Sequence, residues 1–285
     1  MAKEKINFED EQVKKNYWHT SSHILAQAVK KLWPEAKLAI GPAIDNGFYY
    51  DFDLEYRFTE ADFLKIQKEM KKIIQANYPL ERFELSREEA LKLMKEAEEP
   101  YKVELINDLP EDSIISFYKQ GGFTDLCAGP HMESTGQIKA VKIMSVAGAY
   151  WRGDSDKKML QRLYAVSFPT QEELDEYVNR IEEAKKRDHR KIGKEMDLFA
   201  LYEEGPGFPF FMPKGMIIRN ELEYFWRTEH RKRGYEEIKT PLILNEQLWR
   251  TSGHWDHYKD NMYFTNRRGR FCYQTNELPG FHACL

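Results

Sequence analysis

The 285-residue sequence has few cysteines, no long apolar run and no internal repeat. Its three cysteines, at positions 127, 272 and 284, are odd in number and irregularly spaced. That pattern argues against a disulfide framework and for a reducing compartment. No stretch of about eighteen apolar residues occurs, so we expect no transmembrane span. The N-terminal residues contain neither an apolar core nor a cleavage-like site, so we expect a cytoplasmic protein.

What the sequence does contain is typical of a globular protein. Hydrophobic residues make up 41% of the chain and charged residues 32%, and the length suffices for two domains. The formal net charge of −4 conceals a basic cluster, KKRDHRK, at residues 185–191. Such a cluster either meets nucleic-acid phosphates or forms the solvated face of a helix. Charge alone does not separate these two interpretations.

Two short motifs carry most of the chemistry. Residues 19–23 read HTSSH, and residues 125–131 read DLCAGPH. They place His19 and His23, and likewise Cys127 and His131, four positions apart. This residue set suits zinc, but it also suits a metal-free cluster that binds a ribose or orients water through hydrogen bonds. A third interpretation, Cys127 as a nucleophile, has the least support because nothing in the sequence indicates a lowered thiol pKa.

The pattern of residues 20–33 predicts a helix that Pro34 ends. At about 100° per residue, His19 and His23 lie nearly opposite the apolar stripe of that helix, so we expect them to face a cleft or solvent. Lys102 and Asp125 lie on segments that we expect to border the same cleft.

The remaining segments predict alternating helices and strands. Asn46 and Gly47 indicate a hairpin, after which Tyr49 and Tyr50 should face opposite sides of a strand. Capping boxes predict helices after positions 59, 86 and 170. Strand-like segments follow at 80–85, 101–106, 114–118 and within 138–168, so residues 1–168 read as one α+β domain. Further on, a helix at 216–233 should end at Gly234, before an extended segment at 236–244 that should lie at an edge or bulge because of Pro241.

The chain closely resembles bacterial-type threonyl-tRNA synthetase. Besides the two motifs above, the matching stretches are AIGPAIDNGFYYD (39–51), YKV (101–103), GAYWRGD (148–154), KRDHRKIG (186–193) and TSGHWDHY (251–258). The resemblance implies an antiparallel-sheet editing domain of the threonyl/alanyl second additional domain type at 1–168. A connector helix at 169–194 would follow, and then, at 195–285, the start of a class II synthetase core with motif 1.

The resemblance further implies hydrolytic editing of Ser-tRNA(Thr), with the terminal seryl-adenosine as the group recognised. Carried over position by position, the catalytic set is His19, His23, Lys102, Asp125, Cys127 and His131. The residues implied to bind substrate or tRNA are Tyr50, Arg152, Lys186, Arg187 and Arg190. Serine lacks one methyl of threonine, which is worth only ~1–3 kcal/mol in a binding pocket, so a second, hydrolytic site is needed for fidelity.

The cofactor expectation follows from the same resemblance. Editing should need none, although zinc could be held by His19, His23, Cys127 and His131, as in the alanyl relatives. ATP and a catalytic zinc belong to the full-length family enzyme. Here residues 274–281 read QTNELPGF, and Leu278 stands where the family has its first catalytic-zinc cysteine. We therefore expect an incomplete core that does not activate threonine by itself.

Two other functions stay open at this point. The chain can be a fragment of a threonine–tRNA ligase that aminoacylates tRNA(Thr) with ATP at full length. Alternatively, it is a non-catalytic paralogue that binds tRNA or forms a homodimer through the motif 1 region, residues 217–241.

Overall fold

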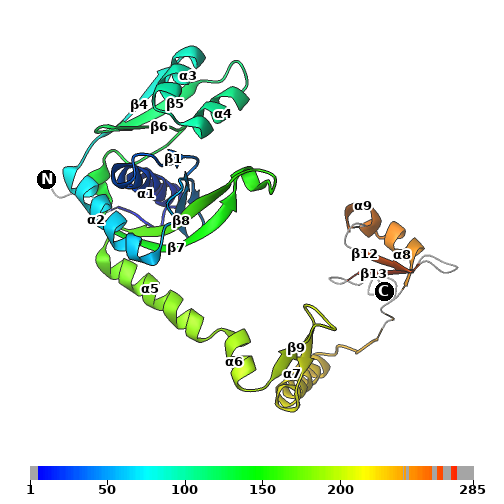
Figure 1. Cartoon of the computed structure of the whole chain (residues 1–285). Helices are drawn as coiled ribbons and strands as arrows, with labels where there is room; N and C mark the ends of the chain where they lie inside the picture. Colours follow the sequence, from blue (N-terminus) through cyan, green and yellow to red (C-terminus); the bar gives the residue numbers. More distant parts are fainter. Residues whose placement is uncertain (1–5, 240, 242–243, 259–261, 266–270, 275–285) are drawn as a thin grey trace. The chain divides into compact units, whose positions relative to one another are not determined.

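The computed structural model describes residues 6–239, 241, 244–258, 262–265 and 271–274. They fall into two compact units, Met1–Lys186 and Arg187–Leu285, so the predicted connector at 169–194 spans the boundary. The strand pairings of the described residues are antiparallel in both units. The expected mixture of helices and antiparallel sheets is therefore confirmed (Figure 1). No helix of the described residues is both long and apolar enough to cross a membrane.

The first unit contains two antiparallel sheets. The larger has the order β1-β3-β8-β7, with β2 also paired to β3, and the smaller has the order β4-β5-β6. The strands are β1 (Lys37–Leu38), β2 (Ala43–Ile44), β3 (Gly47–Asp53), β4 (Leu80–Leu85), β5 (Ile115–Gln120), β6 (Phe123–Leu126), β7 (Ala140–Tyr150) and β8 (Met159–Phe168). The helices are α1 (Glu11–Leu32), α2 (Glu60–Ala76), α3 (Arg87–Glu96), α4 (Pro100–Asp108) and α5 (Gln171–Lys186), with short 3-10 turns η1 (Thr135–Gln137) and η2 (Trp151–Gly153).

Helix α1 is the central element of this unit. It begins nine residues before the predicted segment, because the side chain of Asp10 caps it by accepting hydrogen bonds from the amides of Gln12 and Val13. Helices α1 and α2 and strands β3 and β8 share one hydrophobic core. From Tyr17 to Val29 nearly every side chain of α1 is buried. Apart from His19, which is partly exposed, the polar side of the helix between these residues is therefore enclosed by protein.

The smaller sheet is covered by α3 and α4, which share a second core with it. The prediction of a strand at residues 101–106 is wrong, because these residues form most of α4. Pro100 occupies the first turn of that helix, where a missing amide proton costs nothing. The buried residues of α4 are Tyr101, Lys102 and Ile106. Their spacing is helical, but the apolar residues between them made the segment resemble a strand.

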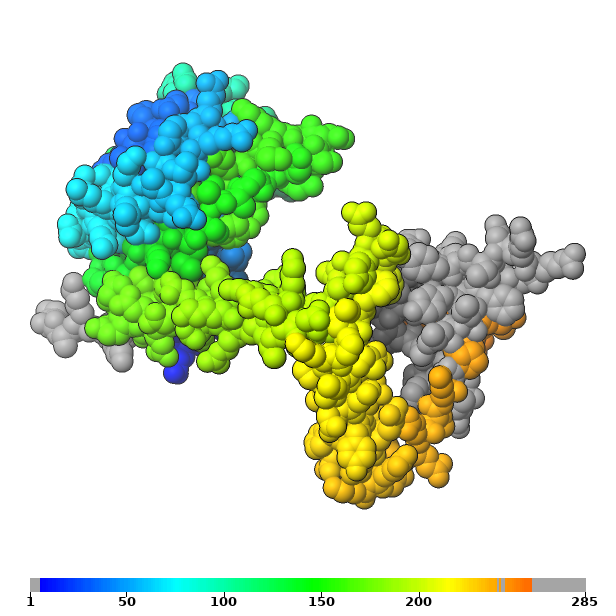
Figure 2. All heavy atoms as spheres, turned by 60° about the horizontal axis from the view of Figure 1, so that its bottom comes forward, coloured from blue at the N-terminus to red at the C-terminus, as the bar shows by residue number. Residues whose placement is uncertain are grey.

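Several local predictions for the first unit are confirmed. Gly47 has a φ of 134° and joins β2 to β3, and Tyr50 is buried while Tyr49 lies on the other side of the strand. The capping boxes begin α2 and α3, and Thr170 and Glu173 bond each other at the start of α5. Leu174 and Val178 of α5 pack against β7 and β8, and in Figure 2 this helix runs along the surface of the unit in yellow-green.

The second unit consists of short pieces. Its helices are α6 (His189–Glu195), α7 (Pro213–Lys232), α8 (Glu246–Thr251) and α9 (His254–Tyr258), and its strands are β9 (Phe199–Leu201), β10 (Pro209–Phe211), β11 (Leu244–Asn245), β12 (Met262–Thr265) and β13 (Phe271–Gln274). Helix α7 confirms the helix predicted at 216–233, and Gly234 follows it with a φ of 78°.

The extended segment predicted at 236–244 is only partly found. Residues 236–239 form no strand, and Leu244 opens β11, which lies at the edge of the sheet β11-β13-β12. Positions 240 and 242–243 lie outside the described residues. So does Leu278, together with the rest of the departure from the family pattern after Gln274.

Candidate active site

The two histidine-bearing motifs meet in the first unit. His19 and His23 lie one turn apart on α1, while Cys127 and His131 lie on the loop that follows β6. One nitrogen or sulfur atom from each of the four residues lies within 4.8 Å of the others. The ring of His131 stacks on that of His19 at 4.1 Å and meets the edge of His23 at 4.3 Å. Segments more than a hundred residues apart in the sequence therefore form a single polar cluster.

The loop that carries Cys127 and His131 is held by its backbone. The amide of Cys127 donates to the carbonyl of Ser116 in β5, and the hydroxyl of Ser116 donates back to the carbonyl of Cys127. Gly129 then turns the chain with a φ of 74°. A side chain at this position would collide with the phenol of Tyr118, whose ring also meets that of His131 at 4.4 Å. Glycine is therefore required where the loop passes between the thiol and the imidazole.

Hydrogen bonds connect the cluster internally. Sγ of Cys127 lies 3.3 Å from Nε2 of His19 and 3.2 Å from Nε2 of His131. The outer nitrogens also have partners, since Nδ1 of His19 is 3.2 Å from the Pro130 carbonyl and Nδ1 of His131 is 3.3 Å from the Thr20 hydroxyl. His23 differs, because its Nδ1 is buried and has no hydrogen-bond partner among the described residues.

A buried ionic group lies beside the imidazoles. Nζ of Lys102 is 2.6 Å from Oδ1 of Asp125 and donates to the Tyr50 hydroxyl at 3.1 Å. That hydroxyl donates to Oδ2 of Asp125 at 2.6 Å, and Nε2 of His23 is 3.8 Å from the same oxygen. The side chains of Lys102 and Asp125 are only 4% and 2% exposed. Their charges therefore compensate each other inside the protein.

Burial controls the protonation of this site. Burial lowers the pKa of His19, and it lowers that of His23 much further, with help from the charges of His19 and Lys102. Burial and the neighbouring histidines lower the pKa of His131 as well. Burial raises the pKa of the Cys127 thiol to about 12. At neutral pH the imidazoles are therefore uncharged and the thiol keeps its proton, which disfavours Cys127 as a nucleophile.

The same four residues fit a zinc ion in their donor chemistry. Bonds of about 2.0–2.3 Å in a tetrahedral site place neighbouring donors roughly 3.3–3.8 Å apart, close to the separations of Sγ from the two Nε2 atoms. The outer nitrogens of His19 and His131 already have partners of the kind that orient metal-bound histidines. The unpartnered Nδ1 of His23 is a further donor. Geometry thus admits both a zinc site and a metal-free cluster.

His19 connects the cluster to a cavity of about 230 Å³. The cavity is lined by Gln12, Lys15, Asn16, His19, Pro42, Ala43, Gly129 and Pro130. His19, Cys127 and His131 are partly exposed, whereas His23, Lys102, Asp125 and Tyr50 are buried behind them. The exposed members can therefore meet a ligand first, and the buried His23 ring lies in direct contact with the rings of His19 and His131.

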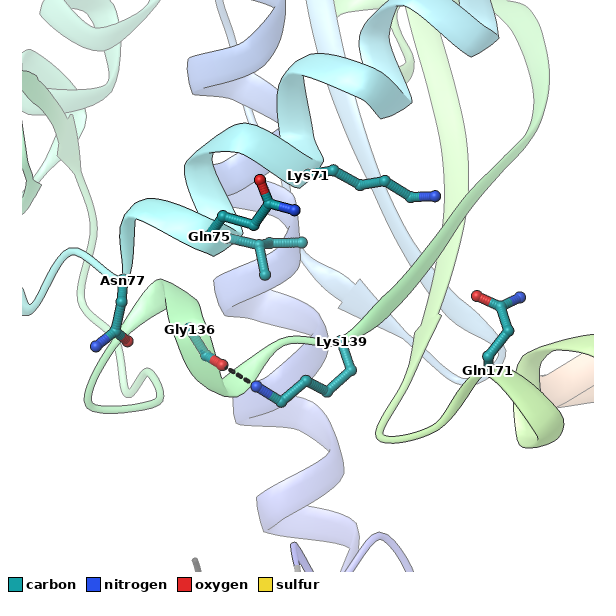
Figure 3. Close-up of a pocket in the computed structure, with 7 residues that line it drawn as sticks. Lys71, Gln75, Asn77, Gly136, Lys139 and Gln171 are labelled. Carbon is teal, nitrogen blue, oxygen red and sulfur yellow. Dashed lines mark hydrogen bonds between the residues drawn. The ribbon is translucent and has the colours of Figure 1, made fainter.

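A larger cavity of about 500 Å³ lies elsewhere in the unit. Figure 3 shows its polar lining, with Lys71 and Gln75 from α2, Lys139 bonded to the Gly136 carbonyl, and Gln171 at the start of α5. No imidazole, thiol or carboxylate lines it. Size alone therefore does not identify the reactive site of this unit.

The predicted tRNA-binding residues are not part of the cluster. Arg152 binds Asp108 and Glu104 of α4 and lies over the ring of Trp151. Lys186 pairs with Glu183 on α5. Arg190 pairs with Asp188 on α6 in the second unit, to which Arg187 also belongs. Tyr50, by contrast, lies inside the site, where its hydroxyl donates to Asp125 and accepts from Lys102.

Sequence analysis missed Thr20 and Tyr118, both of which contact His131. Thr20 could have been noticed, because it lies inside the HTSSH motif on the helical turn that carries the histidines. Nothing in the sequence marks Tyr118, which reaches the site only through the pairing of β5 with β6.

Comparisons with known proteins show what the chain is similar to. Residues 115–164 match the family described as "Threonyl and Alanyl tRNA synthetase second additional domain". A threonine–tRNA ligase of Caldanaerobacter subterraneus is 69% identical over 276 residues, which is 96% of this chain and 43% of the relative. A threonine–tRNA ligase of Acetivibrio thermocellus is 70% identical over 260 residues, 91% of this chain and 41% of the relative. Over nearly its whole length the chain is similar to threonine–tRNA ligases.

This similarity confirms the resemblance to threonyl-tRNA synthetase that the motifs indicate. Among solved structures, the RNA binding domain of threonyl-tRNA synthetase from Cryptosporidium parvum is 35% identical, covering 34% of this chain and 25% of that one. Its TM-score of 0.33 is too low to bear on the fold. The chain spans less than half the length of the two relatives. What the full-length ligases do is therefore proposed for this chain and is not established by the similarity.

Proposed function

We propose that the chain is an editing hydrolase that cleaves the ester bond of Ser-tRNA(Thr). The observation that carries the proposal is the convergence of His19, His23, Cys127 and His131 beside a cavity that His19 lines. The match of residues 115–164 to a domain shared by threonyl- and alanyl-tRNA synthetases supports it. The terminal seryl-adenosine of the tRNA occupies that cavity in this proposal.

Ester hydrolysis needs a water molecule, a base that accepts its proton, and a donor for the developing oxyanion. His23 supplies the base, because its Nδ1 has no partner among the described residues and its Nε2 lies near Asp125. Lys102 has three N–H donors, of which Asp125 and Tyr50 take two. In this proposal the third N–H donates to the ester carbonyl oxygen when substrate is bound. An aminoacyl ester is labile, so such positioning suffices for hydrolysis.

Editing proceeds without a metal ion in this proposal. The hydrogen bonds among His19, Cys127 and His131 satisfy the inner atoms of all three residues. If zinc were bound, the same residues with His23 would hold it, and it would supply an activated water. A chelator is therefore expected to leave the hydrolysis rate unchanged, and elemental analysis to find well below one zinc per chain.

Basic residues are proposed to contact tRNA(Thr). Lys186, Arg187 and Arg190 lie near the end of α5 and the start of α6, and such contacts make binding strongly salt-dependent. Arg152 keeps its predicted role in tRNA binding, although its bonds to Asp108 and Glu104 also hold α4. That helix carries Lys102 into the site.

The direct test is deacylation of Ser-tRNA(Thr) by the chain. We expect enzymatic turnover that His131→Ala lowers about 100-fold, because loss of the ring that packs against His19 and His23 displaces the proposed base, and misplacing a reacting group costs roughly that much. Equal rates for both proteins would refute the proposal. Tight, salt-dependent tRNA binding without hydrolysis would instead favour the non-catalytic paralogue. Threonine-dependent exchange of pyrophosphate into ATP would assign ligase chemistry to the chain as well.

A second copy of the chain is the proposed partner of α7. Among the described residues, this helix exposes the apolar side chains of Ile217, Ile218, Leu222, Tyr224 and Phe225, which is unusual for an isolated surface. Light scattering after gel filtration should therefore give the mass of a dimer. Phe225→Asp should give a monomer, whereas Leu64→Asp, an equally exposed site on α2, should not. A wild-type monomer would contradict this proposal.

A further inference from the structure

A single line of hydrogen bonds runs through the active-site cluster between two backbone groups. It starts at the amide of Met132, which donates to the Thr20 hydroxyl at 2.9 Å. It continues from Thr20 to Nδ1 of His131, from Nε2 of His131 to Sγ of Cys127, and from Sγ to Nε2 of His19. It ends where Nδ1 of His19 meets the Pro130 carbonyl. Every residue of the line thus has a partner on each side, and Sγ of Cys127 also accepts a hydrogen bond from the amide of Gly129 at 3.2 Å.

The two ends fix the direction of each bond. A carbonyl only accepts and an amide N–H only donates. Nδ1 of His19 must therefore carry the proton of that ring, which leaves its Nε2 as an acceptor for the thiol proton of Cys127. Because the thiol proton is donated to His19, the sulfur acts as an acceptor for its other two partners, the amide of Gly129 and Nε2–H of His131. Nδ1 of His131 is then an acceptor, and the Thr20 hydroxyl is its donor.

We propose that Thr20 is a positioning residue, whose hydroxyl donates to Nδ1 of His131 and holds that ring in the tautomer with its proton on Nε2. The consequence for catalysis, which rests on the proposed function, is that the three histidines have different roles. His19 and His131 have both nitrogens engaged within the line. The lone pair of His23 Nδ1 is left as the acceptor for a proton from water.

The neighbouring hydroxyls show that this arrangement is particular to Thr20. Serine and threonine inside a helix commonly donate to a carbonyl of the preceding turn. Ser21 does so with the carbonyl of Tyr17, and Ser22 with that of His19. The hydroxyl of Thr20 is fully buried and bonds only the amide of Met132 and the ring of His131 among the described residues.

Nuclear magnetic resonance of the full chain, labelled with ¹⁵N-histidine, tests the inference directly. The chain has eight histidines, and the His131 signal is identified by its loss in His131→Ala. We expect long-range ¹H–¹⁵N correlations to show the His131 proton on Nε2. Thr20→Val should yield a mixture of tautomers, and Thr20→Ser should restore the single form. A wild-type proton on Nδ1, as zinc at Nε2 would require, overturns the inference.

Kinetics supply a second readout. Thr20→Val should lower kcat for Ser-tRNA hydrolysis about 10- to 100-fold with little change in KM, the range typical of residues that orient a reactive histidine. Thr20→Ser should recover most of the rate. Ser21→Ala, which removes a buried hydroxyl from the same turn without touching His131, should not lower kcat, and a loss equal to that of Thr20→Val contradicts the inference. If the wild type lacks hydrolysis, the proposed function fails while the tautomer measurement still decides the role of Thr20.

Discussion

Replacing Lys102 by methionine is expected to lower the free energy of unfolding by about 3–5 kcal/mol, the cost of leaving one charge of a buried pair uncompensated. The reason is that, among the described residues, Asp125 would keep the Tyr50 hydroxyl as a side-chain hydrogen-bond donor but would have no cation to balance its charge. Urea unfolding followed by circular dichroism measures the change. Ser-tRNA hydrolysis should be lost in the same variant, because Lys102 is also the proposed oxyanion donor.

Two control variants make this result interpretable. The double variant Lys102→Met with Asp125→Asn removes both charges and should recover a large part of the lost stability. Lys186→Met breaks a pair whose side chains are 70% and 51% exposed, and pairs of that kind contribute only about 0–1 kcal/mol. Equal losses from Lys102→Met and Lys186→Met would show that the buried pair has no special role in stability.

The second large effect is a loss of stability as pH falls below about 6.5. Burial lowers the pKa of His19, His23 and His131 below the ordinary histidine value of 6.5, so the unfolded chain binds protons that the folded chain does not. Below its pKa in the unfolded chain, each such group lowers the free energy of unfolding by about 1.4 kcal/mol for every unit that the pH falls. Together they give up to about 4 kcal/mol per pH unit. Stability should therefore rise with pH through this window.

The measurement is the urea unfolding free energy between about pH 5 and 6.5, a range above the ordinary glutamate pKa of 4.5. Asp51 and Glu99 act in the opposite sense, because burial raises their pKa and their deprotonation in the unfolded chain destabilises the fold as pH rises. His131→Asn isolates the histidine contribution, since it should reduce the slope by about 1.4 kcal/mol per pH unit at most. An unchanged slope in that variant would mean that His131 is not buried in its neutral form.

The sequence predicted the members of the cluster better than their arrangement. Four-residue spacing on a helix placed His19 beside His23, and the family resemblance paired them with Cys127 and His131. The capping boxes and the hairpin at Gly47 were also predicted correctly, because each depends on a few adjacent residues. These features are local or are recorded in motifs, which is why they could be found without coordinates.

The errors have a common physical origin in long-range packing. Residues 101–106 looked like a strand, yet packing of Ile106 against the smaller sheet selects a helix. The role of Thr20 depends on the orientation of the His131 ring, which no spacing encodes. The bond between Tyr50 and Asp125 was likewise not predicted, because it joins β3 to β6. Such contacts are set only when the two sheets and α1 come together.

The most direct test of the account compares Ser-tRNA(Thr) with Thr-tRNA(Thr) as substrates of the same preparation of the chain. If the cluster is an editing site, the seryl ester should be hydrolysed faster, by about 10-fold or more, because the site must reject the methyl group that distinguishes threonine. Equal hydrolysis of both esters, or of neither, would contradict the central claim that this pocket selects serine for removal.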